Sequence, residues 1–263
     1  MGNKIVKARI GMRTSYAAPI IAEPLNAHPT YGAVLDMGAA VKGYTTVETA
    51  SLDLYGDDEN LVHDEKFVRG ALDAETARDD LELNAALYGH AYDAGAETSN
   101  KDDSSPFVGY GYIEPILLKT KQVIYRATML YKLSANASSE KNEADTKKAD
   151  LDAKMNAIAY TIYADNTGDW RKRLEFSTEA EAEAWILTQF GSRSVHVVKT
   201  AIHGAGSVDK PAVAVESGNV TLTFSSAPSI LIDNGTDVTS SLSNKSYTIA
   251  SVSADHDVIA VFA

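Results

Sequence analysis

The chain has 263 residues, a net charge of −12 at pH 7, no cysteine and a hydrophobic fraction of 44%. This length predicts one large domain or two smaller ones, with enough apolar side chains to build a core. The lack of cysteine excludes disulfides and thiolate metal sites within the chain. The acidic balance disfavours ordinary nucleic-acid binding, which depends on clustered Lys and Arg. No apolar run approaches the roughly 20 residues of a transmembrane helix, so we expect no membrane anchor.

The N-terminal region has the pattern of extended chain. Its first 16 residues carry charge and lack the apolar segment of a secretory signal, so no signal peptide is expected. Pro19, Pro24 and Pro29 follow, and each of them disfavours helix locally. We therefore predict an arm or loop here, and no helical start.

The next segment predicts short strands and one helix. Polar and apolar residues alternate over 44–55, which indicates a strand, and 56–76 indicates an acidic turn with two short strands. The acidic run 57–60 lacks the oxygen spacing and central glycine of a calcium loop, so we predict a solvated turn. A helix pattern over 78–88 ends at Gly89, and a spacer without a predicted element follows.

The chain is organised around a predicted β-hairpin. Two apolar, aromatic-rich runs at 107–118 and 123–133 are joined by the polar residues 119–122. In the second run one face is apolar and the other is mixed. This alternation is typical of a sheet that packs on one side and faces solvent, a channel or a neighbouring subunit on the other.

A charged segment separates this hairpin from later elements. Residues 135–152 contain almost no large apolar side chain, so we predict a mobile loop between strands. We expect this loop to become ordered only when a partner binds it. Strand patterns follow at 155–164 and 170–176. Thr178 and Glu181 then form the capping-box pattern that begins a helix, and a glycine ends it.

The composition changes in the last quarter of the chain. From residue 204 onward, short alternating runs rich in Ser, Thr, Val and Asn are separated by turns. Asn234-Gly235 between two of these runs is a strong signal for a two-residue hairpin turn. We predict a small all-β sandwich over 204–263, connected through 192–203 to a first domain over 1–195.

Residues for catalysis or metal binding form no recognisable pattern. The six histidines show neither paired metal-ligand spacing nor the HExxH motif. The chain also lacks a nucleophile elbow and a phosphate-binding Gly-Lys-Ser/Thr loop, and Gly204-Ala205-Gly206 is interpreted as a flexible junction. Carboxylates are plentiful, but no spacing rule selects a glycosidase pair. We therefore predict no catalytic residue, no metal site and no cofactor, and we do not expect an enzyme.

Three stretches carry a resemblance to a known family. In order, residues 48–76, 79–93 and 104–148 resemble the major tail protein family of long-tailed, non-contractile bacteriophages. In that family a strand pair with an acidic turn precedes a short helix, and an aromatic hairpin follows. The resemblance covers roughly residues 5–190. It implies a mainly β fold, a β-sandwich with one α-helix on its flank, which assembles as six-membered rings stacked into a tail tube. A similar fold occurs in the tube protein of type VI secretion.

This resemblance implies a structural virion protein whose tube conducts DNA during ejection into the host. The implied partners are further copies of the chain, a tape measure protein and the tail terminator and initiator proteins, while genomic DNA passes through the lumen without specific binding. The implied location is the virion tail, after assembly in the host cytoplasm. Candidate inter-subunit contacts are Pro19 and Pro24 of the arm and Glu143, Thr146 and Lys147 of the charged loop. An acidic lumen wall would not hold phosphates.

The C-terminal stretch 218–263 resembles immunoglobulin-like and bacterial surface-repeat β-sandwiches. Such modules often decorate the outside of phage tails. The resemblance implies an outward-facing Ig-like domain that is dispensable for tube assembly and binds weakly to host-surface glycans.

Two other classes of protein stay open at the level of sequence. The first is a two-domain cell-surface carbohydrate-binding adhesin, against which the expected lack of a signal peptide counts. The second is a hydrolase with paired carboxylates, which needs a cleft that perturbs them, and nothing in the sequence indicates one.

Overall fold

A computed structural model describes residues 7–56, 59–140 and 155–262, with the backbone alone for 52–56 and 59–63. This part of the chain is mainly β, with strands in several sheets and two α-helices, which confirms the predicted fold class. Within it, neither helix is long and apolar enough to cross a membrane.

The chain divides into two compact units. The first consists of residues 1–10, 113–128 and 173–263, and the second of residues 11–112 and 129–172. The division therefore cuts through the aromatic hairpin, whose two strands contribute to both units.

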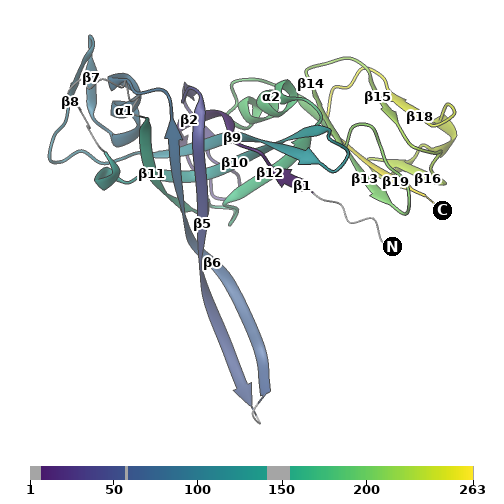
Figure 1. Cartoon of the computed structure of the whole chain (residues 1–263), viewed down its shortest axis with the longest axis horizontal. Coiled ribbons are helices and arrows are strands. Elements are labelled where there is room, and N and C mark those ends of the chain that lie inside the picture. The colour runs from purple at the N-terminus through teal and green to yellow at the C-terminus, as the bar shows by residue number, and fades with distance from the viewer. Residues whose placement is uncertain (1–6, 57–58, 141–154, 263) are drawn as a thin grey trace. The chain divides into compact units, whose positions relative to one another are not determined.

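The larger sheet contains ten strands (Figure 1). They are β1 (Lys7–Arg9), β2 (Arg13–Ala22), β3 (Thr30–Tyr31), β4 (Leu35–Asp36), β5 (Ala40–Gly56), β6 (Glu59–Thr76), β9 (Phe107–Leu118), β10 (Val123–Ala135), β11 (Asn156–Tyr163) and β12 (Arg171–Phe176). Seven of them follow the order β3-β2-β9-β10-β11-β6-β5. The other three lie off this path, with β1 paired to β9, β4 to β2 and β12 to β10.

The proline-rich N-terminal segment is part of this sheet, so the prediction of an arm or loop is wrong over β2. Pro19 lies inside β2, where its carbonyl oxygen accepts a hydrogen bond from Gly32 N at 2.8 Å. The register of β2 with β3 shifts between Ile20 and Ala22. Proline cannot donate to a ladder, but it fits a strand at an edge or an irregularity where its nitrogen needs no partner.

β5 and β6 form one long hairpin, where a strand and two further short strands were predicted. The two strands have 17 and 18 residues. Their pairing runs from Ala40–Thr76 to Gly56–Glu59 and contains three register shifts. Such shifts increase the local twist of a ribbon without ending it.

A core cluster joins the sheet to helix α1 (Leu81–Tyr88), which begins three residues later than predicted. The Asp80 carboxylate caps the helix by accepting a hydrogen bond from Leu83 N at 2.8 Å. Gly89 ends it with a φ of 80°, the left-handed conformation that glycine adopts most easily. The buried cluster consists of Ala17, Met37, Leu72, Ala74, Leu83, Leu87, Tyr88, Val108, Tyr110, Tyr112, Leu130, Leu133, Ala135, Ile158, Tyr160 and Ile162.

The spacer after α1 contains a small hairpin that the sequence analysis missed. Strands β7 (Ala91–Asp93) and β8 (Ala96–Thr98) pair with each other around a turn in which Gly95 has a φ of 87°. Farther along, the charged loop begins with a 3-10 turn, η1 (Ala137–Ser139). Glu140 follows this turn, and residues 141–152 of the predicted loop lie outside the described residues.

The predicted aromatic hairpin is confirmed as β9 and β10. The expectation of one open face is wrong for its middle, because residues 108–116 of β9 and 127–131 of β10 are all buried. Tyr31 of β3 covers part of this region, since a Cβ atom added to Gly109 would lie 2.4 Å from the Tyr31 ring. Tyr31, whose hydroxyl also donates to Tyr131 O at 2.8 Å, therefore closes part of the opening that the alternation predicted.

The elements that follow the charged loop agree with their patterns. β11 and β12 lie where strands were predicted. Helix α2 (Glu179–Gln189) has the predicted capping box, in which Thr178 and Glu181 bond to each other's backbone N–H groups. Trp185 and Ile186 of α2 are buried, and the ring of Trp185 lies 6.1 Å from that of Phe176.

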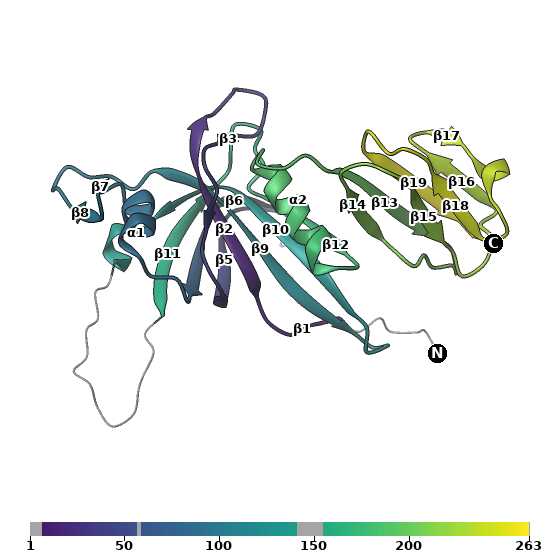
Figure 2. The ribbon, with the colours of Figure 1, turned by 90° about the horizontal axis from the view of Figure 1, so that it is seen from above.

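The C-terminal strands form a small sandwich (Figure 2). They are β13 (His196–His203), β14 (Ala212–Val215), β15 (Val220–Thr223), β16 (Ile230–Asp233), β17 (Thr236–Asp237), β18 (Ser246–Ile249) and β19 (His256–Val261). One sheet has the order β14-β13-β19-β16-β17, and β15 pairs with β18 in the other. Both sheets contribute side chains to one core cluster, among them Val198, Leu222, Leu231 and Tyr247.

The predicted turn in this sandwich is confirmed. Asn234-Gly235 lies between β16 and β17, with φ values of 46° and 80°. The connecting segment 192–203 contains β13, which pairs with β14 and runs parallel to β19. The connection therefore also contributes a strand to the sandwich.

We predict that Gly89→Ala destabilises the fold more than Gly95→Ala does. The two glycines have similar φ angles, 80° at Gly89 and 87° at Gly95. A Cβ atom on Gly89 would lie 2.2 Å from Ser104 O, whereas a Cβ atom on Gly95 would meet nothing within 4 Å. The expected losses in free energy of unfolding are about 3 kcal/mol and about 1 kcal/mol. Urea denaturation measures both, and equal losses would contradict the role of the Gly89 contact.

Candidate functional site

The far end of the β5–β6 hairpin has no third strand among the described residues. β11 pairs with β6 only over Gly70–Thr76. Beyond it, nine residue pairs from Glu48–Arg69 to Gly56–Glu59 join β5 to β6 alone. At about 3.3 Å per residue, this distal hairpin (residues 48–56 and 59–69) extends roughly 30 Å past the sheet. Figure 1 shows this extension.

A two-stranded ribbon of this kind leaves many backbone hydrogen-bonding groups without a protein partner. A two-stranded hairpin is marginally stable in water, and its outer edges present unpaired N–H and C=O groups. The β5–β6 hairpin also exposes apolar side chains, with Val41, Tyr44, Val47 and Val68 exposed by 49%, 60%, 46% and 51%. Open strand edges beside exposed apolar groups are typical of a surface that another chain covers.

An aromatic stack anchors the base of the distal hairpin. The ring of Phe67 on β6 lies parallel to that of Trp170, with centroids 4.8 Å apart and an interplanar angle of 2°. The Arg171 guanidinium lies 4.2 Å from the centroid of the same indole ring. The stack ties the ribbon to the segment that precedes β12, so the pairs farther out extend from a fixed support.

A second exposed apolar surface lies at the end of β2 and in the loop after it. In this edge loop (residues 19–25), Ile21 and Leu25 are exposed by 70% and 81%. The neighbouring edge strand β3 has only two residues. A short edge strand limits uncontrolled pairing, so the apolar loop is the part of this edge that offers contact area.

Several polar contacts hold the edge loop in place. The Asn166 amide Nδ2 donates to the carbonyl oxygens of Glu23 and Pro24 at 3.1 and 3.3 Å. Lys132 Nζ bonds to a Glu23 carboxylate oxygen at 2.7 Å and lies 4.2 Å above the Phe107 ring. Because these groups order the loop in advance, a partner that covers it loses less conformational freedom on binding.

His28 completes the anchoring of this loop. Its ring stacks on Tyr131 with centroids 4.0 Å apart, and its Nδ1 lies 2.7 Å from Asp165 Oδ2. The other carboxylate oxygen of Asp165 accepts hydrogen bonds from the backbone N–H groups of Thr167 and Asp169. Burial raises the pKa of Asp165, but the hydrogen bonds from His28 and Thr167 outweigh it, so the pKa lies below its ordinary value.

The C-terminal sandwich has a comparable histidine–carboxylate network. Asp233 is buried, and its carboxylate accepts a hydrogen bond from Tyr247 Oη at 2.8 Å and lies 2.8 Å from His256 Nδ1. Burial, followed by the nearby Asp233, raises the pKa of Tyr247 to about 12. The network joins β16, β18 and β19, and its role is to hold the two sheets together.

The structure locates only part of the predicted contact set. Pro19 is half-buried in β2 and Pro24 is exposed in the edge loop. Glu143, Thr146 and Lys147 lie outside the described residues. The sequence analysis missed the length of the β5–β6 hairpin, although the alternating runs on both sides of the acidic turn were the available signal.

No protein-family model matches the chain, and no curated protein matches it. The resemblance to tail proteins stays a prediction that rests on the quoted stretches of sequence.

We predict that Asp165→Ala lowers the free energy of unfolding by about 2 kcal/mol at pH 7, because it leaves several donors without their acceptor. The pKa of this carboxyl is lowered in the folded protein, so its stabilising effect is present above the ordinary value of 3.8 and is lost as the pH falls below it. Urea denaturation should therefore show that the difference in free energy of unfolding between wild type and variant becomes smaller from pH 7 to about pH 3.

The matched control is Asp169→Ala. The Asp169 side chain is 65% exposed and lies 3.9 Å from His28 Nε2. Its removal is expected to change the free energy of unfolding by at most about 0.5 kcal/mol. Equal losses at the two positions, or a gap for Asp165 that persists at low pH, would contradict the assigned network.

Proposed function

We propose that this chain is the structural subunit of a phage tail tube, which polymerises as stacked six-membered rings and conducts DNA during ejection. The observation that carries the proposal is the distal hairpin, a ribbon of nine residue pairs without a third strand among the described residues. Further copies of the chain are the proposed partners for its open edges.

The exposed apolar surfaces support self-assembly. The β5–β6 hairpin and the edge loop lie in the same compact unit, and each combines exposed apolar side chains with a firmly held base. A closed ring needs two different surfaces on each subunit that contact one another in a head-to-tail manner. The two surfaces meet this requirement.

The net charge of −12 supports the role of a conduit. DNA that moves through a tube must not be held at its wall, and acidic side chains repel phosphates. In this proposal genomic DNA passes through the lumen without specific binding, while a tape measure protein and terminator and initiator proteins control the length and ends of the tube.

The C-terminal sandwich is proposed to decorate the outside of the tube and to contact host-surface glycans weakly. It has a core cluster of its own, drawn from residues 198–262. A core of this kind is characteristic of a module that keeps its fold independently of other contacts. We therefore expect that the contacts between subunits of the tube do not require the surface residues of the sandwich.

We predict that shortening the hairpin prevents assembly and leaves the subunit folded. In the variant, residues 50–66 are replaced by Asn-Gly, which joins the paired residues Thr49 and Phe67 through a two-residue turn. The stack of Phe67 on Trp170 is retained. Light scattering over a concentration series, with circular dichroism for folding, should show a folded monomer where the wild type forms large particles.

A single substitution tests the part of the distal hairpin that the shortened variant retains, with a matched control. Val68→Glu puts a charge on the hairpin, and Ile230→Glu puts one on the C-terminal sandwich, at side chains that are 51% and 44% exposed. Burying an unpaired charge costs well over 1.4 kcal/mol, so Val68→Glu should raise the concentration needed for assembly at least about tenfold. Unchanged assembly of Val68→Glu, or equal inhibition by Ile230→Glu, would contradict the proposal.

A further inference from the structure

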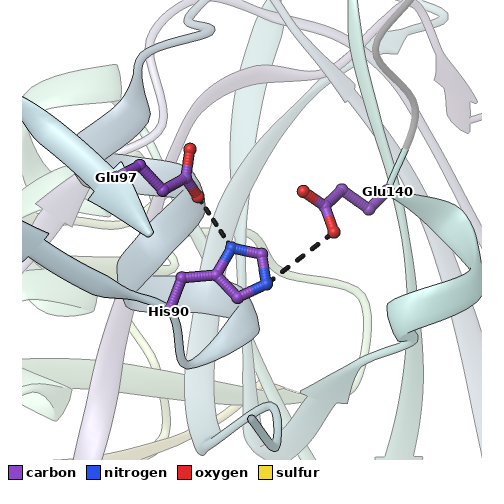
Figure 3. Close-up of side chains that lie close together, drawn as sticks. All are labelled: His90, Glu97 and Glu140. Atoms are coloured by element: carbon purple, nitrogen blue, oxygen red, sulfur yellow. Dashed lines mark hydrogen bonds and ion pairs between the residues drawn. The ribbon is translucent and has the colours of Figure 1, made fainter. Parts of the chain in front are cut away.

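His90 lies between two carboxylates that come from separate elements (Figure 3). It directly follows the glycine that ends α1, while Glu97 lies on β8 and Glu140 follows η1. One ligand atom from each residue lies within 4.8 Å of the others. The three residues therefore form a compact set of nitrogen and oxygen donors.

The contact with Glu97 determines which ring nitrogen carries the proton. His90 Nδ1 lies 2.7 Å from Glu97 Oε1, a short hydrogen bond. An ionised carboxylate can only accept, so the proton of this bond lies on Nδ1. The neutral ring then presents the lone pair of Nε2 on its opposite side.

The opposite side of the ring faces Glu140 across a gap. His90 Nε2 lies 3.8 Å from Glu140 Oε2, which is beyond hydrogen-bond distance. Two donors on one tetrahedral zinc ion lie roughly 3.4 Å apart, because each bond is about 2.0–2.1 Å long. The gap is therefore close to the spacing of two ligands that share an ion.

The surroundings hold the histidine in this orientation. Its side chain is 8% exposed and that of Glu97 is 14% exposed. The backbone N–H of His90 donates to Ala85 O at 3.0 Å, which fixes the residue to the end of α1. The hydroxyl groups of Tyr88 and Ser139 lie 3.3 Å apart, and this contact keeps η1, and with it Glu140, beside the helix.

We propose that His90 Nε2 and Glu140 form a binding site for a divalent transition-metal ion, with Zn²⁺ as the best fit. Imidazole and carboxylate are ligands that zinc accepts, and water fills its remaining positions. Glu97 is a positioning residue, since a carboxylate on the far nitrogen of a ligating histidine fixes the tautomer and the orientation of the ring. The bound ion ties Glu140, which follows η1, to the end of α1, while the hydrogen bond of Glu97 to Nδ1 connects β8 to the same histidine. The sequence analysis predicted no metal site, and this proposal departs from it.

His28 provides an internal comparison. It too bonds to a carboxylate through Nδ1 and has a second carboxylate 3.9 Å from Nε2. There, however, the histidine and Asp169 side chains are 41% and 65% exposed, against 8% and 32% at His90 and Glu140. The His28 ring is held by Tyr131 and Asp165, but its second carboxylate, on Asp169, is twice as exposed as that of Glu140 and loses more conformational freedom on binding, so the His90 site is expected to bind zinc more tightly.

The test is calorimetric titration of the untagged, EDTA-treated full chain with zinc chloride. The expected result for the wild type is one saturable ion per chain and a melting temperature raised by about 5 °C at a hundredfold excess over Kd. Glu140→Gln should weaken binding at least tenfold, and Glu97→Gln should weaken it 10- to 100-fold. The control His28→Gln should leave it unchanged.

Each variant is also melted without metal, which separates lost binding from lost folding. Glu140 is the partly exposed member, so Glu140→Gln is expected to melt as the wild type does when zinc is absent. The proposal is overturned if the wild type shows no saturable zinc binding. It is also overturned if Glu140→Gln binds as the wild type does, or if His28→Gln removes the binding.

Discussion

Backbone hydrogen bonding along β6 is the constraint on which the proposed role depends. Over Gly70–Thr76 this strand lies between β5 and β11 and is paired with both of them. From Arg69 outward, β5 is its only described partner. The same strand therefore serves as sheet interior at one end and as an open ribbon at the other. The transition occurs beside the Phe67–Trp170 stack, which supplies the support that the missing neighbour does not.

Histidine–carboxylate pairs recur where loops must be held. His28 fixes the edge loop through Asp165, His90 joins α1 to β8 through Glu97, and His256 joins the C-terminal strands through Asp233. In all three pairs Nδ1 faces the carboxylate. In each pair the carboxylate is at most 14% exposed, and a hydrogen bond to a buried carboxylate fixes a ring firmly because it is charge-assisted and lies in a region of low dielectric. These pairs hold loops and strands of an acidic chain in place without the need for a Lys or Arg partner at each carboxylate.

Local patterns in the sequence predicted local elements well. The capping box of α2, the glycine that ends α1 and the Asn234-Gly235 turn act over a few residues, and all three are confirmed. The resemblance to tail proteins anticipated a mainly β chain with a flanking helix, which the structure shows. Side-chain clusters were beyond sequence reasoning because their members are far apart along the chain. His28 and Asp165, for example, are separated by 137 positions. Alternation in the second run also failed to predict that residues 127–131 of β10 are buried on both faces, since cover from another strand, such as Tyr31 of β3 on Tyr131, leaves no periodic signal.

The proposed tube requires that other copies of the chain cover the distal hairpin. Negative-stain electron microscopy of the wild-type protein, on samples whose mass is followed by light scattering over a concentration series, tests it most directly. The account predicts hollow particles with six-fold symmetry that lengthen by stacking as the concentration rises. A particle of single-chain mass throughout the series would contradict it.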